Sequence, residues 1–201
     1  MKKLILFSFL AFFAGRIIAQ NIKSIDVGKA APKVDVEMLD ISGQKVSIKS
    51  AMGEKGVLVM FSCNTCPYVI KNEERTKAIM AYAHKNGYGV IIINSNEAKR
   101  DQDDSYEEMM TYAKKQNYTC YYTVDENSNI ADVFGATRTP EVFLIDAKGI
   151  VVYKGAIDDN PAEAENVKRE HLKIAIDELN SGKAITVKES KSVGCSIKRK
   201  S

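Results

Sequence analysis

The sequence predicts one α/β domain: a mixed β-sheet with helices on both faces, an N-terminal β-hairpin and an extra inserted αβ unit. Two continuous apolar runs, 56–61 and 90–93, have the pattern of strands buried on both sides. Segments with helical spacing alternate with strands along most of the chain, which is typical of a sheet covered by helices on both faces. The length is ample for one domain with a substantial core.

Each predicted element has a local signal. The elements are, in chain order, a hairpin (34–39 and 45–48), a strand (56–61), a helix (67–84), a strand (88–94), a helix from 106 opened by the capping box of Ser105 and Glu108, a strand (118–123), a short helix (130–134) stopped by Gly135, a second hairpin (141–145 and 150–153) and a last helix (172–179) ended by Gly182. A polar tail follows.

The first 19 residues have the pattern of a cleaved secretory signal. Lys2 and Lys3 precede an apolar run over 4–14, which is about half the roughly 20 residues needed to span a bilayer. Ala19 offers a small residue for cleavage. We expect a signal peptide over 1–19, a domain over 20–182, a C-terminal tail over 183–201, and an exported protein, periplasmic or secreted, without stable membrane association after cleavage.

Charge excludes some partners. The chain has 29 basic and 26 acidic residues, and the leader holds three of the basic ones, so the remaining 26 basic and 26 acidic residues balance. This balance predicts no affinity for nucleic acid or an anionic membrane. The acidic clusters at 101–104 and 158–160 lack the spacing of a calcium loop, so we interpret them as solvated loops. We expect neither a metal ion nor a cofactor.

Cys63 and Cys66 are the candidate catalytic residues, because they form a C-x-x-C motif where a buried strand ends and a helix begins. The partial positive charge of a helix N-terminus stabilises a thiolate. We therefore predict Cys63 as the exposed thiol of low pKa and Cys66 as the buried thiol behind it, which resolves a mixed disulfide. A zinc site would need further ligands, and the isolated His84 and His171 do not supply them.

On these residues the chain resembles thioredoxin-fold proteins of the redoxin branch, which includes exported thiol-disulfide oxidoreductases. The resemblance runs from about Gly28 to Asn180 and rests on the segments 28–32, 61–67 and 139–140. It implies a thioredoxin-like fold with a cis proline at Pro140, packed against the active-site sulfurs. It also implies that Thr139 and Pro140 bind substrate, with the Thr139 backbone facing an incoming strand.

The resemblance implies disulfide exchange with protein or small-molecule disulfide substrates, supported by an upstream thiol reductant. We expect a reductant of exported proteins. Ser62 stands where such proteins usually have tryptophan before the motif, and the strand over 56–61 holds no buried acid. The proton acceptor for Cys66 is therefore unassigned.

Other functions use the same fold. A peroxiredoxin has P-x-x-x-T-x-x-C, but Gly56 and Met60 stand where Cys63 would require the proline and the threonine. Copper-binding relatives space their cysteines one residue further apart, and a metal- or partner-binding domain without enzymatic activity would leave the cysteines idle. A peroxide reductase and such a binding domain remain the alternatives.

Two cysteines lie outside the motif. Cys120 is on a predicted strand and is expected to be a small buried apolar residue. Cys195 lies in the apolar segment 193–197 of an otherwise charged tail, so we expect this segment to dock on the domain. The role of Cys195 stays open between an accessory thiol and an apolar anchor.

Overall fold

The computed structural model describes residues 22–200. The predicted signal sequence over 1–19 lies outside the described residues. The strands are β1 (Met38–Asp40), β2 (Lys45–Val46), β3 (Gly56–Ser62), β4 (Tyr88–Asn94), β5 (Tyr121–Val124), β6 (Arg138–Thr139), β7 (Glu141–Asp146), β8 (Val151–Gly155) and β9 (Cys195–Ser196). The α-helices are α1 (Pro67–Lys71), α2 (Glu73–Lys85), α3 (Tyr106–Gln116), α4 (Asn129–Phe134) and α5 (His171–Asn180).

Seven strands form the central sheet in the order β2-β1-β5-β4-β3-β7-β8. β3, β4 and β5 are parallel to their neighbours in that set, while β7, β8, β1 and β2 pair antiparallel. The sheet is therefore mixed, as predicted. The inserted unit is α3 with β5, which extends the sheet beyond β4 and provides the edge that the N-terminal hairpin joins. β6 and β9 form a separate two-stranded sheet.

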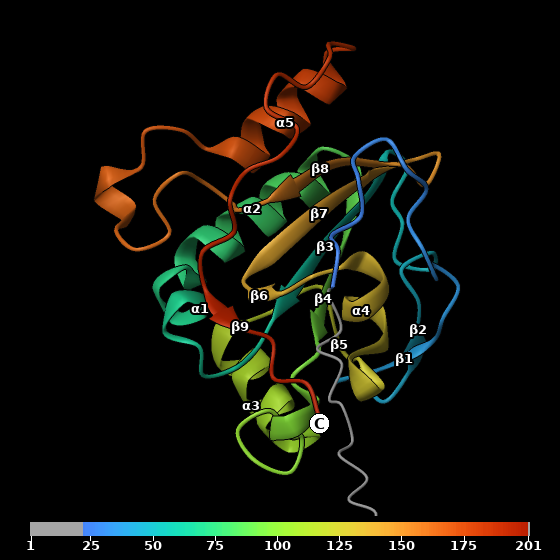
Figure 1. The fold of residues 1–201 in the computed structure, drawn as a ribbon, viewed down its shortest axis with the longest axis vertical. Coiled ribbons are helices and arrows are strands. Elements are labelled where there is room, and N and C mark those ends of the chain that lie inside the picture. The colour runs from blue at the N-terminus through green and yellow to red at the C-terminus, as the bar shows by residue number, and fades with distance from the viewer. Residues whose placement is uncertain (1–21, 201) are drawn as a thin grey trace, which may run out of the picture.

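Both faces of the sheet are covered, and β3 shows why its sequence is continuously apolar. Val57, Val59 and Phe61 join a core cluster that includes residues of α4, while Leu58 and Met60 join a second cluster with residues of α2, α3 and α5. Every residue of β3 is buried. Figure 1 shows α4 on one side of the sheet and α2 on the other. The prediction of helices on both faces is confirmed.

The helix predicted over 67–84 is interrupted at Asn72, which separates α1 from α2. The Asn72 side-chain amide donates to the Tyr68 carbonyl at 2.7 Å and to the Pro161 carbonyl at 3.0 Å. Such a side chain competes with the hydrogen bonds of the helical backbone. The interruption therefore ties the end of α1 to the loop that precedes α5.

Other boundaries follow local chemistry. Ser105 accepts a hydrogen bond from the Glu108 amide at 3.2 Å and caps α3, and Gly135 ends α4 with φ 66°. The first hairpin is shorter than predicted, and β5 begins at Tyr121, so Cys120 precedes the strand instead of lying on it.

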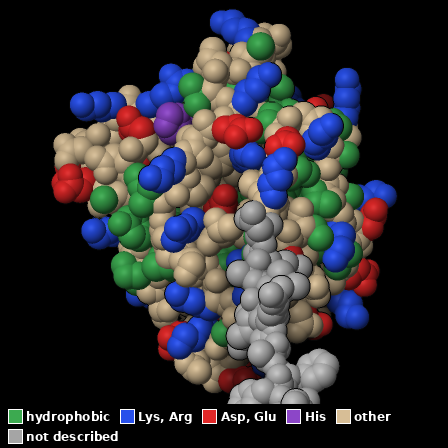
Figure 2. Space-filling model, in the orientation of Figure 1, with side chains coloured by type: hydrophobic (Ala, Val, Ile, Leu, Met, Phe, Trp, Pro, Cys, Tyr) green, Lys and Arg blue, Asp and Glu red, His purple; other side chains and the backbone are tan. Residues whose placement is uncertain are grey.

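The tail crosses the front of the domain. It runs from α5 past β8 to β9 beside β6, and the chain ends near α3 and α4 (Figure 1). On the face shown in Figure 2, basic and acidic side chains are interspersed. Within residues 22–200, no helix is both long enough and apolar enough to cross a bilayer.

The aromatic cluster on the α4 face gives a stability prediction. Phe134 is fully buried, and its ring lies 5.7 Å from Phe61 and 5.2 Å from Phe143, both edge-to-face. Replacing Phe134 with Ala leaves a cavity, and we expect a loss of about 3–5 kcal/mol in the free energy of unfolding, measured with urea. Met110→Ala, at a residue that is 38% exposed, is the control. Equal losses in the two variants would contradict the packing argument.

Candidate active site

Cys63 and Cys66 lie in the loop between β3 and α1, where the sequence predicted them. Pro67 occupies the first turn of α1, so the helix begins after the second cysteine, and Cys66 is its N-cap residue. Cys63 and Cys66 are 2% and 4% exposed. The prediction of an exposed Cys63 is therefore wrong, because the C-terminal tail covers the motif.

Thr139 contacts both sulfurs of the motif. Its hydroxyl lies 3.3 Å from the Sγ atom of Cys63. Its carbonyl oxygen lies 3.3 Å from the Sγ atom of Cys66, where it accepts a hydrogen bond when that thiol is protonated. The Thr139–Pro140 peptide bond is cis. The structure thus brings the predicted pair and Thr139 into one buried group.

Glu141 shapes the segment that presents Thr139, and sequence reasoning did not single it out. Its carboxylate accepts hydrogen bonds from the backbone amides of Thr137 at 2.8 Å and Arg138 at 3.0 Å. Burial raises the pKa of Glu141, while these two amides act in the opposite direction. The only sign of this role in the sequence was the position of Glu141 directly after Thr139 and Pro140.

The tail brings Cys195 to the same place. β9 pairs antiparallel with β6, and Cys195 is the register partner of Thr139. Cys195 is half-buried and packs against the core cluster that contains Cys63 and Cys66. The expectation that the segment 193–197 docks on the domain is confirmed by this pairing.

Gly194 allows that approach. A Cβ atom at Gly194 would lie 2.1 Å from the Thr139 carbonyl oxygen and 3.3 Å from the Pro140 nitrogen. Both are backbone atoms, which cannot swing aside. The tail backbone therefore lies directly against the Thr139–Pro140 peptide, and this position has room for glycine alone.

The two motif thiols share their titration. The Cys63 thiol lowers the pKa of the neighbouring Cys66, against the opposing effect of burial. The Cys195 thiol and the amides of Val69 and Cys195 act in the same direction on Cys66. The same interaction with Cys66, together with burial, raises the pKa of Cys63, and the Thr139 hydroxyl opposes this. The two sulfurs therefore titrate as one coupled pair, and the assignment of the low pKa to Cys63 stays a prediction.

A buried network of polar side chains hydrogen-bonds to Asn64, which lies between the two cysteines of the motif. The Asp104 carboxylate accepts from the Asn64 amide at 2.9 Å and from the side chains of Asn94 and Asn96, both at 2.8 Å. The Tyr122 hydroxyl donates to the Asn64 side-chain oxygen at 2.7 Å. Asp104 is 1% exposed, so the interpretation of 101–104 as a solvated loop is wrong for this residue. The acidic cluster at 101–104 resembled an exposed loop, and only the fold reveals these partners of Asp104.

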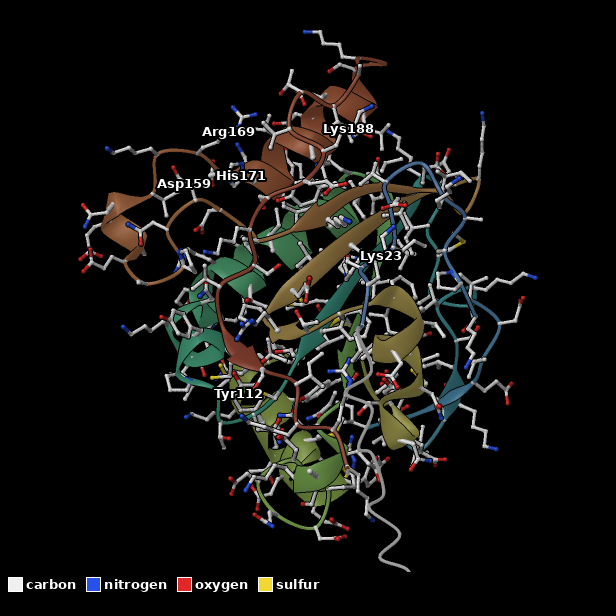
Figure 3. All side chains as sticks on the ribbon, viewed as in Figure 1. Lys23, Tyr112, Asp159, Arg169, His171 and Lys188 are labelled. Atoms are coloured by element: carbon white, nitrogen blue, oxygen red, sulfur yellow. The ribbon has the colours of Figure 1, made fainter. Side chains whose placement is uncertain are left out.

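The remaining candidates lie elsewhere. The Sγ atom of Cys120 lies 3.5 Å from the Sδ atom of Met80, and burial raises the pKa of Cys120 to about 12. His171 starts α5 in the same region as Asp159 and Arg169, as Figure 3 shows. Within residues 22–200, no three His, Cys, Asp or Glu side chains are grouped as metal ligands.

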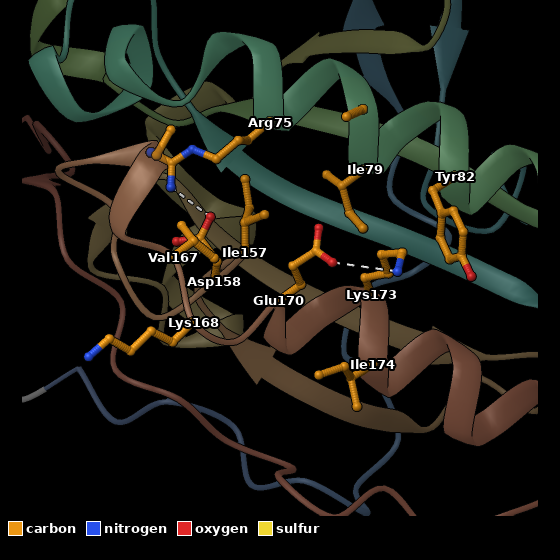
Figure 4. Close-up of a pocket in the computed structure, with 12 residues that line it drawn as sticks. Arg75, Ile79, Tyr82, Ile157, Asp158, Val167, Lys168, Glu170, Lys173 and Ile174 are labelled. Atoms are coloured by element: carbon orange, nitrogen blue, oxygen red, sulfur yellow. Dashed lines mark hydrogen bonds and ion pairs between the residues drawn. The ribbon is translucent and has the colours of Figure 1, made fainter.

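A cavity of about 630 Å³ lies between α2 and the segment leading into α5 (Figure 4). At one end, Arg75 and the buried Asp158 form an ion pair at 2.6 Å, so the 158–160 cluster is also not fully solvated. Its lining contains no cysteine. The cavity is therefore separate from the thiol group.

Two cysteines between a buried strand and a helix, in a mixed sheet of this order, define a thioredoxin-like redox fold. The chain belongs to the Redoxin family, which matches it over residues 26–169. It is 26% identical over 141 residues to the thiol:disulfide interchange protein DsbE of Escherichia coli K12, an alignment that covers 70% of this chain and 71% of that protein.

Solved structures agree. An uncharacterized conserved protein from Geobacillus kaustophilus is 30% identical, with a TM-score of 0.80 over 87% of this chain and 93% of the other. The thioredoxin domain of a thiol-disulfide oxidoreductase from Bacteroides vulgatus is 18% identical, with a TM-score of 0.55 over 66% and 90% of the two chains, and shares the fold. At the level of the family, the chain is a thiol-disulfide oxidoreductase-like protein.

The coupling of the two motif thiols predicts a titration. Because their interaction lowers the pKa of one thiol and raises that of the other, one thiolate should be present at neutral pH and lost as the pH falls into the acidic range. The ultraviolet absorbance of the thiolate in the fully reduced protein measures this. Cys63→Ser and Cys66→Ser should each move the transition to higher pH, because each removes the partner thiol. Cys120→Ser is the control. A transition that is unchanged in both variants would contradict the coupling.

Proposed function

We propose that this protein is an exported thiol-disulfide oxidoreductase that reduces disulfides of exported proteins through Cys63 and Cys66. The observation that carries the proposal is the contact of both sulfurs with Thr139 at the junction of β3 and α1. Membership of the Redoxin family supports the same chemistry. The similarity to DsbE supports a disulfide-bonded protein as the substrate.

The reaction has two exchange steps. The thiolate of Cys63, to which the Thr139 hydroxyl can donate, attacks a substrate disulfide, forms a mixed disulfide and displaces one substrate sulfur as a thiolate. Cys66 then loses its proton and attacks Cys63, which forms the Cys63–Cys66 disulfide and releases the second substrate sulfur. Two electrons and two protons pass to the substrate. An external thiol reductant returns the pair to the dithiol state.

The surroundings of the pair support these roles. The Thr139 hydroxyl can donate to the sulfur of Cys63 and so stabilises the thiolate with which Cys63 attacks in the first step. The hydrogen bond from the Asn64 amide to Asp104 and the one from the Tyr122 hydroxyl to the Asn64 side-chain oxygen hold the motif loop in place. We propose Thr139 and Pro140 as substrate-binding residues, with the Thr139 backbone as the partner of a substrate strand. In the described state β9 occupies that backbone, so such a strand would replace it.

Reduction of insulin by dithiothreitol tests the proposal. The wild-type protein should accelerate it, and Cys63→Ser and Cys66→Ser should each reduce the rate to the uncatalysed level, because each removes one sulfur of the exchange. Cys66→Ser should also trap a mixed disulfide at Cys63, because it removes the resolving thiol. Cys120→Ser, which lies outside the site, should retain the wild-type rate.

Hydrogen peroxide distinguishes the peroxidase alternative. Faster turnover with peroxide than with insulin, under the same thiol supply, would contradict the proposal. No acceleration of either reaction would favour a binding domain without enzymatic activity.

A further inference from the structure

The C-terminal strand places a third cysteine against the motif pair. Cys195 pairs in register with Thr139, and the Thr139 carbonyl oxygen is 3.3 Å from the Sγ atom of Cys66. Paired residues of antiparallel strands have Cα atoms about 4.5–5.5 Å apart, so Cys195 is within a few ångströms of the residue that touches both motif sulfurs. Cys195 also packs against the core cluster that contains Cys66.

Contacts on the C-terminal side of Cys195 fix this position. The buried Ile197 packs in the core cluster of the α4 face, and its amide donates to the Thr137 carbonyl at 3.0 Å. The Lys198 amide donates to the Asn96 side chain at 2.8 Å, and Arg199 pairs with Asp132 at 2.7 Å.

Contacts on the N-terminal side are equally specific. The Ser190 hydroxyl accepts from the Ala156 amide at 2.9 Å and lies 2.7 Å from the Tyr153 hydroxyl. A Cβ atom at Gly155 would lie 2.3 Å from the Ser190 hydroxyl, so β8 has a slot in which this serine fits. The strand is thus tied to the domain before and after Cys195. A merely apolar anchor would need none of these polar contacts around a cysteine.

We propose that Cys195 is a third redox-active thiol, which exchanges into the oxidised motif and forms a Cys66–Cys195 disulfide. This rests on the proposed function, because that function generates the Cys63–Cys66 disulfide. The Cys195 thiolate attacks Cys66, the Cys63–Cys66 bond breaks as the Cys66–Cys195 bond forms, and Cys63 takes the proton that Cys195 loses. No electrons are gained or lost. The product holds β9 covalently over Thr139 and leaves Cys63 as a free thiol.

Peptide mapping of the oxidised full chain tests the pairing. The protein is equilibrated in a glutathione redox buffer, free thiols are blocked with iodoacetamide, and the chain is digested with trypsin without reduction. Cys63 and Cys66 fall in the peptide 56–71, and Cys195 falls in 192–198. We expect these two peptides linked, with fragmentation placing the bond on Cys66. In Cys63→Ser, which retains Cys66, Cys120 and Cys195, only Cys120 should stay alkylatable after oxidation.

Gly194→Ala tests whether the strand delivers the thiol. It keeps all four cysteines but places a methyl group against the Thr139 carbonyl, so the yield of linked peptide should fall at least about tenfold, a change that about 1.4 kcal/mol of strain would produce. Gly43→Ala is the control: its added Cβ has nothing within 4 Å, and the strain that its φ of 81° imposes falls on a turn between β1 and β2, remote from the cysteines, so the yield should not change. An unchanged yield in Gly194→Ala would overturn the role of the strand.

The possible failures are distinguishable. If the wild-type protein forms the Cys63–Cys66 disulfide and reduces insulin, but Cys66 and Cys195 both stay alkylatable in oxidised Cys63→Ser, this inference is wrong and the proposed function stands. A bond from Cys195 to Cys120 would also overturn it. If the wild-type protein forms no disulfide involving Cys63 or Cys66, the proposed function is wrong, and so is this inference, which rests on it.

Discussion

Thr139 is the residue on which the site depends, because it meets three cysteines with three different groups. Its hydroxyl contacts Cys63, its carbonyl oxygen contacts Cys66, and its position in β6 pairs with Cys195. Glu141 holds the preceding backbone through two amide hydrogen bonds. A change in this short segment would therefore alter the surroundings of all three sulfurs together.

Burial gives the motif its particular electrostatics. A thiolate removed from water is costly unless hydrogen bonds replace its solvation. Cys66 obtains these from Cys63, Cys195 and the helix N-terminus, whereas Cys63 has the Thr139 hydroxyl. The two sulfurs at the helix start therefore depend on one another and on these donors to hold a negative charge. The cover provided by β9 both removes water and supplies part of the replacement.

The sequence predicted the features that are determined by residues close together in the chain. The apolar run of β3, the C-x-x-C motif, the capping serine of α3 and the stop at Gly135 all depend on neighbours within a few residues, and each agrees with the structure. The docking of the segment around Cys195 was also foreseen, from its apolar character within a charged tail.

What the sequence could not supply were contacts between residues far apart in the chain. Asp104 looked like part of a solvated acidic loop, yet it anchors Asn64, 40 residues earlier. Thr139, the partner of Cys195 in β6, is similarly remote in the sequence. The sequence therefore could not show that the segment around Cys195 docks beside the motif.

The position of β9 after the rest of the site in the sequence has a consequence for the order of assembly. All the other parts of the site, from β3 to β7, precede it, and N-terminal parts of a protein are synthesised first. The strand that shields the sulfurs is therefore made after the segments that it shields. The newly made chain passes through a stage in which the cysteine pair is present and its cover is still missing.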